Sequence, residues 1–141
     1  MPATRTTSSA VALATLLVSG ALTGALAAQA DNSKTIADGV YSAAQAERGE
    51  ARFKTSCSSC HTPGAFAGGA FADRWNGQTM GEVFEFVSNA MPENDPGGLS
   101  AEEYANVLAF FLKVNGYKLG DSDLPSQAAE LKAFKIVPVP R

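Results

Sequence analysis

The most regular pattern of apolar and polar residues lies at residues 100–116. Its apolar positions recur every three or four residues, which places them on one face of a helix: Tyr104, Val107, Leu108 and Phe111. Ser100 precedes this face and Glu103 follows three residues later, the spacing of a capping box. Gly116 is a natural end point. The pattern predicts an amphipathic helix between Ser100 and Gly116.

Two further segments are also predicted to be helical. Residues 79–90 start with Thr79 and its box partner Glu82, and they carry an apolar face at helical spacing, made of Met80, Val83, Phe84 and Val87. Residues 42–56 start with Ser42 and Gln45, again three residues apart, and run up to the first cysteine. These two segments and residues 100–116 are predicted to be the main helices.

The connecting segments contain residues that interrupt helices. Residues 62–78, "TPGAFAGGAFADRWNGQ", and residues 91–98, "MPENDPGG", are rich in glycine or proline and predict loops. One more short helical pattern covers roughly residues 125–134, before a proline-limited tail. No alternating strand pattern of useful length and no internal repeat is apparent. The predicted fold class is therefore all-α, and 141 residues fit one domain.

The N-terminal 30 residues differ from the rest. Residues 10–28 carry no charge, Arg5 precedes them, and the small-x-small sequence Ala28, Gln29, Ala30 follows. This arrangement is typical of a secretory signal peptide, so we expect residues 1–30 to be cleaved and the protein to be periplasmic. The mature domain is then 31–141, with a core at about 42–116 and a C-terminal helical extension at 117–141. An uncleaved membrane anchor is the alternative, because the run approaches the ~20 residues that span a bilayer.

The charge balance argues against one class of partner. The whole chain has 11 basic and 14 acidic residues and a net charge of −3. Loss of residues 1–30 removes only Arg5 among these charged residues and leaves a net charge of −4. A nucleic-acid-binding protein would present a basic face, so no nucleic-acid partner is expected.

The candidate chemistry lies in residues 57–61, "CSSCH". These five positions hold both cysteines of the chain, Cys57 and Cys60, and its only histidine, His61. Cys-x-x-Cys-His is the signature of covalent c-type haem attachment. Each thiol adds across one haem vinyl group, and two intervening residues let both sulfurs face the same edge of the macrocycle. The next residue, His61, brings its imidazole to the iron. The expected cofactor is one covalently bound haem c.

Three other interpretations of this motif fit the sequence less well. A disulfide between Cys57 and Cys60 would close so small a loop that it would stabilise little. A thioredoxin-like redox pair would need a βαβ setting, whereas this chain is predicted to be helical. A structural zinc site needs four ligands, and the chain has three Cys or His residues.

The second axial ligand of the haem iron is expected to be a methionine, because the chain has no second histidine. Met80 and Met91 are the candidates that remain after residues 1–30 are removed. Met80 lies in register with the apolar face of residues 79–90, so a role in the core explains it well. Met91 precedes Pro92, which favours an extended backbone. We therefore favour Met91, with a vacant or labile sixth position as the remaining alternative.

These residues resemble those of a class I monohaem cytochrome c. Besides "CSSCH", Gly49 and Phe53 lie eight and four residues before Cys57. In that family such a glycine lets the N-terminal and C-terminal helices cross closely around the haem, here against Leu108 and Phe111. The Gly-Pro that supports the histidine in mitochondrial members is replaced here by "HTPGAFAGGAF".

The run "MPENDPGGLSAEEYANVLAFFLKVNGYKLG" is more particular. It resembles bacterial periplasmic cytochromes, and cytochrome domains, associated with quinoprotein alcohol or sugar dehydrogenases. The resemblance covers roughly residues 42–135 and implies that the Met of "MP", Met91 here, is the distal ligand.

The function that follows is one-electron transfer rather than enzymatic catalysis. No catalytic triad, paired acid–base candidates or phosphate-binding loop is apparent in the sequence. The expected partners are a periplasmic dehydrogenase as electron donor and a respiratory oxidase as acceptor, with membrane contact only if the N-terminal segment is uncleaved. Two alternatives remain: a permanent haem subunit of a dehydrogenase complex, with residues 120–141 as a candidate docking segment, and a gas- or peroxide-binding haem protein if the Met ligand is labile.

Overall fold

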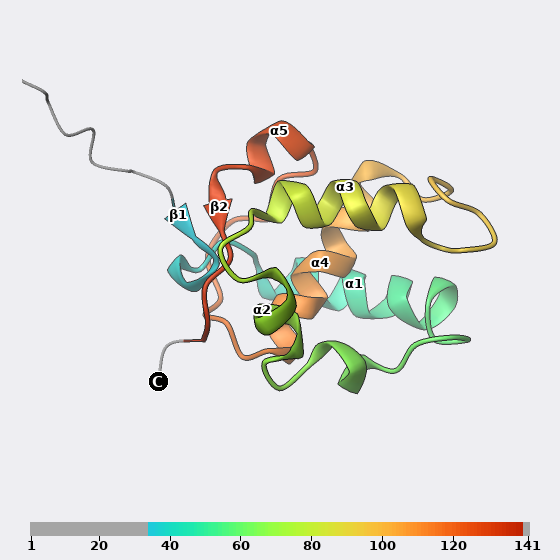
Figure 1. Cartoon of the computed structure of the whole chain (residues 1–141), viewed down its shortest axis with the longest axis horizontal. Coiled ribbons are helices and arrows are strands. Elements are labelled where there is room, and N and C mark those ends of the chain that lie inside the picture. The colour runs from blue at the N-terminus through green and yellow to red at the C-terminus, as the bar shows by residue number, and fades with distance from the viewer. Residues whose placement is uncertain (1–33, 140–141) are drawn as a thin grey trace, which may run out of the picture. The chain divides into compact units, whose positions relative to one another are not determined.

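The computed structural model describes residues 34–139, which lie in one compact unit of the chain. The predicted signal peptide lies outside the described residues. Five helices dominate the structure (Figure 1), with two turns of 3-10 helix and two very short strands. In chain order the elements are β1 (Lys34–Thr35), η1 (Ile36–Asp38), α1 (Ala43–Ser56), η2 (Pro63–Phe66), α2 (Ala70–Trp75), α3 (Met80–Ala90), α4 (Ala101–Val114), α5 (Ala128–Leu131) and β2 (Phe134–Lys135). The predicted all-α, cytochrome c-like fold class is confirmed.

The three main helices begin where their caps predict. The Thr79 and Ser100 hydroxyls accept the backbone N–H groups of Glu82 and Glu103, at 3.3 and 3.2 Å. Each glutamate in turn accepts the backbone N–H of its capping residue, at 2.7 and 2.8 Å, so both predicted capping boxes form. At α1 the Ser42 hydroxyl accepts the Gln45 N–H at 3.0 Å. These local bonds satisfy N–H groups that no helical carbonyl can reach.

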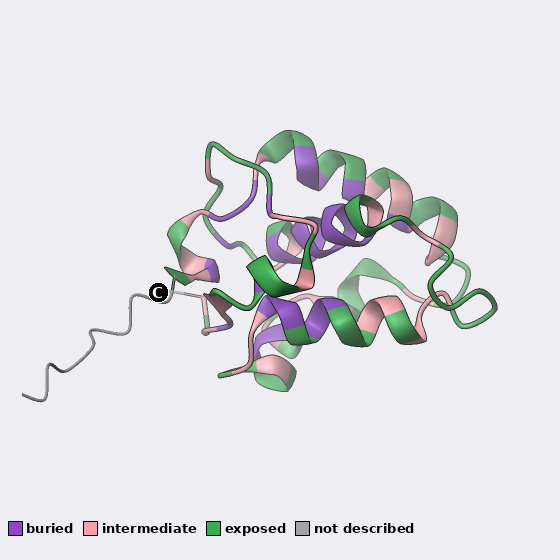
Figure 2. Cartoon of the chain, turned by 90° about the horizontal axis from the view of Figure 1, so that it is seen from above, coloured by how far each residue is buried: buried purple, intermediate pink, exposed green. Residues whose placement is uncertain are grey.

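The most extensive contact between elements of the described unit is the crossing of α1 and α4. It is possible because Gly49, in the middle of α1, has no side chain. A Cβ at this position would lie 1.8 Å from the Asn106 carbonyl oxygen and 3.0 Å from Phe110 Cβ. Helix α4 is buried along most of its length (Figure 2), and Phe53 of α1 packs edge-on against Phe111. The glycine thus sets how closely the two helices approach, as the family resemblance implies. The expected neighbours Leu108 and Phe111 were wrong, because the atoms nearest to Gly49 belong to Asn106 and Phe110.

The sequence prediction was wrong for several short elements. Residues 62–78 contain η2 and α2 rather than a continuous loop, and the C-terminal helix is confined to Ala128–Leu131 rather than extending over residues 125–134. The strands β1 and β2 were not predicted. They are two residues long and pair in parallel, Lys34 with Phe134 and Thr35 with Lys135, so no alternating pattern could reveal them.

The segment after α4 packs back onto its own domain. Leu124, Leu131 and Ile136 are almost completely buried. The Gln45 side chain donates to the Leu124 carbonyl at 2.9 Å and accepts the Leu124 N–H at 2.7 Å. Gln45 therefore completes no capping box with Ser42, because its amide is used to bind this segment. Residues 120–139 therefore pack in part on the domain's own core.

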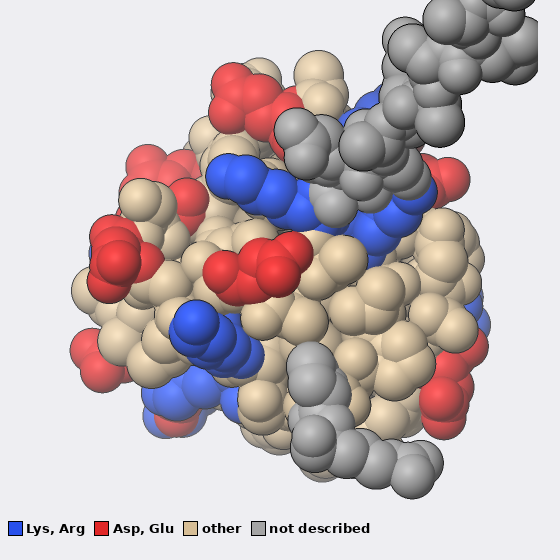
Figure 3. All heavy atoms as spheres, turned by 90° about the vertical axis from the view of Figure 1, so that its left-hand side faces the viewer, with Lys and Arg blue, Asp and Glu red and all other residues tan. Residues whose placement is uncertain are grey.

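Charged side chains of both signs lie on the surface of the described residues. On the face shown in Figure 3, acidic and basic side chains lie interspersed. Several pair with each other, including Lys132 with Glu85 at 2.9 Å and Lys54 with Glu50 at 2.7 Å. Among residues 34–139, no helix has the length and apolar character needed to cross a membrane.

Candidate haem-binding site

The cysteine motif follows directly from the end of α1. Cys57 caps the helix, and its N–H donates to the Phe53 carbonyl at 2.9 Å. The Cys57 carbonyl then accepts the N–H groups of Cys60 at 3.2 Å and His61 at 2.9 Å. The backbone therefore turns tightly over these five residues. This turn brings both thiols and the imidazole to the wall of one cavity.

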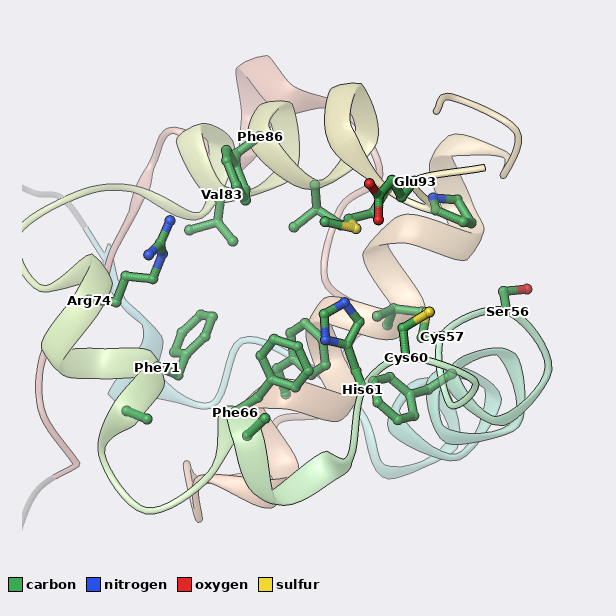
Figure 4. Close-up of a pocket in the computed structure, with 18 of the residues that line it drawn as sticks. Ser56, Cys57, Cys60, His61, Phe66, Phe71, Arg74, Val83, Phe86 and Glu93 are labelled. Atoms are coloured by element: carbon green, nitrogen blue, oxygen red, sulfur yellow. The ribbon is translucent and has the colours of Figure 1, made fainter. Parts of the chain in front are cut away.

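That cavity has a volume of about 590 Å³. It lies between α3 on one side and the motif, η2 and α2 on the other (Figure 4). Its walls are mainly apolar and aromatic, with side chains from four helices that include Phe53, Phe71, Val83, Val87, Val107 and Phe111. The volume falls in the range of about 300–1,000 Å³ that is usual for ligand and cofactor sites.

All four site residues predicted from the sequence lie on the wall of this cavity: Cys57, Cys60, His61 and Met91. Met80, the alternative to Met91, is completely buried in the core and does not line the cavity. Cys60 is exposed and Cys57 half-buried, so the thiol end of the cavity meets solvent. Burial raises the pKa of the Cys57 thiol.

Met91 is held through its backbone. It ends α3, and its N–H donates to the Val87 carbonyl at 2.8 Å. Its backbone is extended, with φ −131° and ψ 149°, as its position before Pro92 predicts. Its carbonyl accepts the hydroxyl of Tyr104, a residue of α4, at 2.6 Å. The sequence identified Tyr104 only as part of an apolar face, although a buried phenol usually has a hydrogen-bond partner.

The His61 ring lies against an aromatic cluster. Its centroid is 5.4 Å from that of Phe66, in an edge-on arrangement, and Phe66 stacks on Phe111 at 4.4 Å. Asn115, the residue that caps the C-terminal end of α4, donates from its side chain to the Phe66 carbonyl at 2.5 Å. Phe66 is thereby fixed from both its ring and its backbone. Sequence reasoning identified neither Phe66 nor Asn115, because only the tertiary fold brings them to His61.

An arginine lies at the end of the cavity away from the cysteines (Figure 4). The Arg74 guanidinium carbon is 5.1 Å from the Trp75 ring centroid and 5.6 Å from that of Phe86. These rings lie 5.3 Å apart, and both line the cavity. A cation over aromatic rings is held by the ring quadrupoles while its N–H donors stay available to an anion.

The structure does not favour the other interpretations of the motif. Both cysteines are free thiols. Within residues 34–139, no cluster of three or more His, Cys, Asp or Glu side chains is suited to hold a metal ion. By contrast, a mainly apolar cavity with two thiols and an imidazole at one end suits a large apolar macrocycle that is attached at one edge. The residues present therefore fit haem c.

Comparison with known proteins agrees with this chemistry. Residues 44–111 match the family model described as cytochrome C oxidase, cbb3-type, subunit III. Comparison with curated proteins and with solved structures gave no match. The matched stretch begins in α1 and ends in α4, and it includes all four predicted site residues. Residues 44–111 are therefore similar to a cytochrome c domain. This similarity implies covalently bound haem c and supports a class I c-type cytochrome.

Proposed function

We propose that this protein is a periplasmic one-electron carrier in which His61 and Met91 are the axial ligands of the haem iron. One observation carries the proposal. Of the two methionines in the described part of the chain, Met91 lies on the wall of the cavity that holds the cysteine motif, whereas Met80 lies in the core. A thioether in that wall can occupy the second axial position, which a carrier needs filled and an oxygen- or peroxide-binding protein needs open.

The residues of the site perform three tasks in this proposal. Haem c supplies a one-electron couple when bound. Cys57 and Cys60 would fix the cofactor to the chain, and His61 and Met91 would hold its iron. The aromatic and aliphatic wall excludes water, and a dry site with a Met ligand raises the reduction potential. Cys60 is exposed, which supports a solvent-facing attachment edge as the place where a redox partner approaches.

The location and partners follow from the sequence. Residues 1–30 are proposed to direct export to the periplasm and to be cleaved there. We place the protein between a dehydrogenase as donor, of the quinoprotein type that the "MPENDPGG" run resembles, and a respiratory oxidase as acceptor. The matched family is named for a subunit of an oxidase, so a haem subunit held permanently in a complex is the second candidate.

The ligand assignment is tested with two matched variants, Met91→Leu and Met80→Leu, in the haem-loaded protein. Leucine conserves volume, so at the core position the expected cost is below about 1.5 kcal/mol. The oxidised wild type is expected to show a sulfur-to-iron charge-transfer band, which Met91→Leu abolishes and Met80→Leu keeps. Carbon monoxide should bind poorly to the reduced wild type and readily to Met91→Leu. Loss of the band in Met80→Leu instead would contradict the assignment.

The carrier and subunit candidates differ in how the protein behaves in solution. A free carrier is expected to elute from size exclusion at the mass of one chain when it is purified from the periplasm under mild conditions. Co-elution with a dehydrogenase or oxidase in fixed stoichiometry, stable to dilution, would favour the permanent subunit.

A further inference from the structure

Tyr104 is buried, and its hydroxyl has a specific target. The side chain belongs to α4, is 3% exposed and packs edge-on against Phe84 of α3, with ring centroids 6.1 Å apart. Its hydroxyl donates to the Met91 carbonyl at 2.6 Å. Met91 lies just after the end of α3 and is not part of a helix. The packed ring fixes the direction of the hydroxyl, so the bond is preorganised.

The backbone hydrogen bonds of residues 92–98, the segment that follows Met91, lie within the segment itself. Asp95 N–H donates to the Pro92 carbonyl at 2.9 Å, and Gly98 N–H donates to the Asp95 carbonyl at 3.0 Å. These turns shape residues 92–98, but they do not fix the segment to the helices that form the cavity. Residues 93–98 are exposed. The Tyr104 hydroxyl therefore provides a long-range anchor at the point where the chain leaves α3.

We propose that Tyr104 is a positioning residue that holds Met91 against the haem iron by fixing the Met91 carbonyl to α4. This inference rests on the proposed ligation by Met91. Helix α4 also crosses α1, whose end carries Cys57. The hydroxyl thus fixes the Met91 backbone to the helix that also supports the attachment motif. Without it, Met91 leaves the iron more often, although the fold is kept.

The consequence can be measured as competition by an external ligand. Imidazole binds the iron only when Met91 has left, so its apparent affinity reports the fraction of open protein. Loss of one such hydrogen bond typically changes an equilibrium about fivefold, within a range of about 2- to 13-fold. Tyr104→Phe is therefore expected to bind imidazole about fivefold more tightly than the wild type does.

Tyr117→Phe is the matched control. Tyr117 is similarly buried, at 4% exposed, and its hydroxyl donates to another backbone carbonyl, that of Val137, at 2.5 Å. Neither hydroxyl belongs to the cavity wall. Imidazole affinity should be unchanged in Tyr117→Phe, even where its thermal stability falls as much as that of Tyr104→Phe. Phenylalanine fills the same space in both variants, and far-UV circular dichroism checks that each is folded.

The outcomes separate the two proposals. A selective increase in Tyr104→Phe supports the positioning role. Equal changes in both tyrosine variants, or no change in either, overturn it and leave ligation by Met91 standing if Met91→Leu still abolishes the sulfur-to-iron band. If the wild type lacks that band, or Met91→Leu binds imidazole no more tightly than the wild type does, ligation by Met91 itself is refuted.

Discussion

Substitution of Gly49 by alanine tests whether α1 and α4 cross as closely as the structure indicates. The new Cβ would lie 1.8 Å from the Asn106 carbonyl oxygen and 2.5 Å from its carbonyl carbon. Ordinary contacts of a Cβ atom begin at 3.4 Å, so the helices must separate by about 1.6 Å at this point. Both nearest atoms belong to the backbone of α4, and neither can move aside as a side chain could.

The expected destabilisation of Gly49→Ala is the difference between two opposing effects. Overpacking of a core costs typically 1–3 kcal/mol, and a backbone clash belongs at about 3 kcal/mol or more. Alanine in place of glycine returns about 1 kcal/mol of helix propensity. The net destabilisation is about 2 kcal/mol. For a domain of this size each 1 kcal/mol lowers the melting temperature by roughly 4–8 °C, so Gly49→Ala should melt roughly 8–16 °C below the wild type.

The assay is thermal unfolding of the haem-loaded protein, followed by far-UV circular dichroism. Gly64→Ala is the control, because Gly64 is a glycine in η2 with negative φ, and its Cβ would meet nothing closer than 3.9 Å. This control should melt at or slightly above the wild-type temperature. If Gly49→Ala melts like Gly64→Ala, the two helices are farther apart than the distance of 1.8 Å from a Cβ at residue 49 to the Asn106 carbonyl oxygen implies. The role of the glycine in the crossing is then refuted.

Two further predictions concern charge. The Ser100 N–H donates to the Glu103 carboxylate and lowers the pKa of that carboxyl below its usual 4.5. The ionised carboxylate therefore stabilises the folded protein above about pH 4.5, and this stabilisation is lost as pH falls through the lower folded-state pKa. Glu103→Gln should therefore melt below the wild type at pH 7, with a difference that vanishes in acid; a difference independent of pH would contradict this. Arg74→Gln should lower the reduction potential by about 10–40 mV in a redox titration, because it removes a positive charge from the cavity wall. Two unit charges about 4 Å apart interact by about 1 kcal/mol in water, and less at greater separation; 59 mV is tenfold for one electron. The control Arg48→Gln removes a charge paired with Asp123 and should change the potential less; equal changes would refute a special role for Arg74.

Much of the fold could be predicted because its main helices are specified locally. The bounds of α3 and α4 follow from a cap, an apolar face and a stop, as with Ser100 and Glu103, and the start of α1 follows from its cap, Ser42. Helix α2 could not be predicted in the same way. It has six residues, too few to establish a period, and it begins after Gly69, whose φ of 93° is set by the loop rather than by a capping side chain. Strands β1 and β2 depend wholly on tertiary pairing.

The site also contains residues that are recognisable from local sequence and residues that only the tertiary fold brings together. The attachment motif could be identified because its residues are consecutive and their spacing reflects the geometry of a macrocycle. Tyr104 and Arg74 could not be identified as parts of the site. Tyr104 looks like any apolar-face residue until α4 is placed beside Met91, and Arg74 resembles a surface charge until Trp75 and Phe86 meet beneath it.

Helix α4 connects these separate features. Through Gly49 it sets the position of α1 and hence of the thiols. Through Tyr104 it fixes the Met91 backbone, and through Asn115 it fixes Phe66, whose ring lies against His61. The two proposed iron ligands, His61 and Met91, are on different segments of the chain, so local structure does not fix their separation. Helix α4 is buried and interacts with the Met91 backbone directly and with His61 through Phe66, so it can set the separation of the two residues although the segment between α3 and α4 is exposed. A carrier needs this property, since a change of ligand geometry between its two redox states would slow each electron transfer.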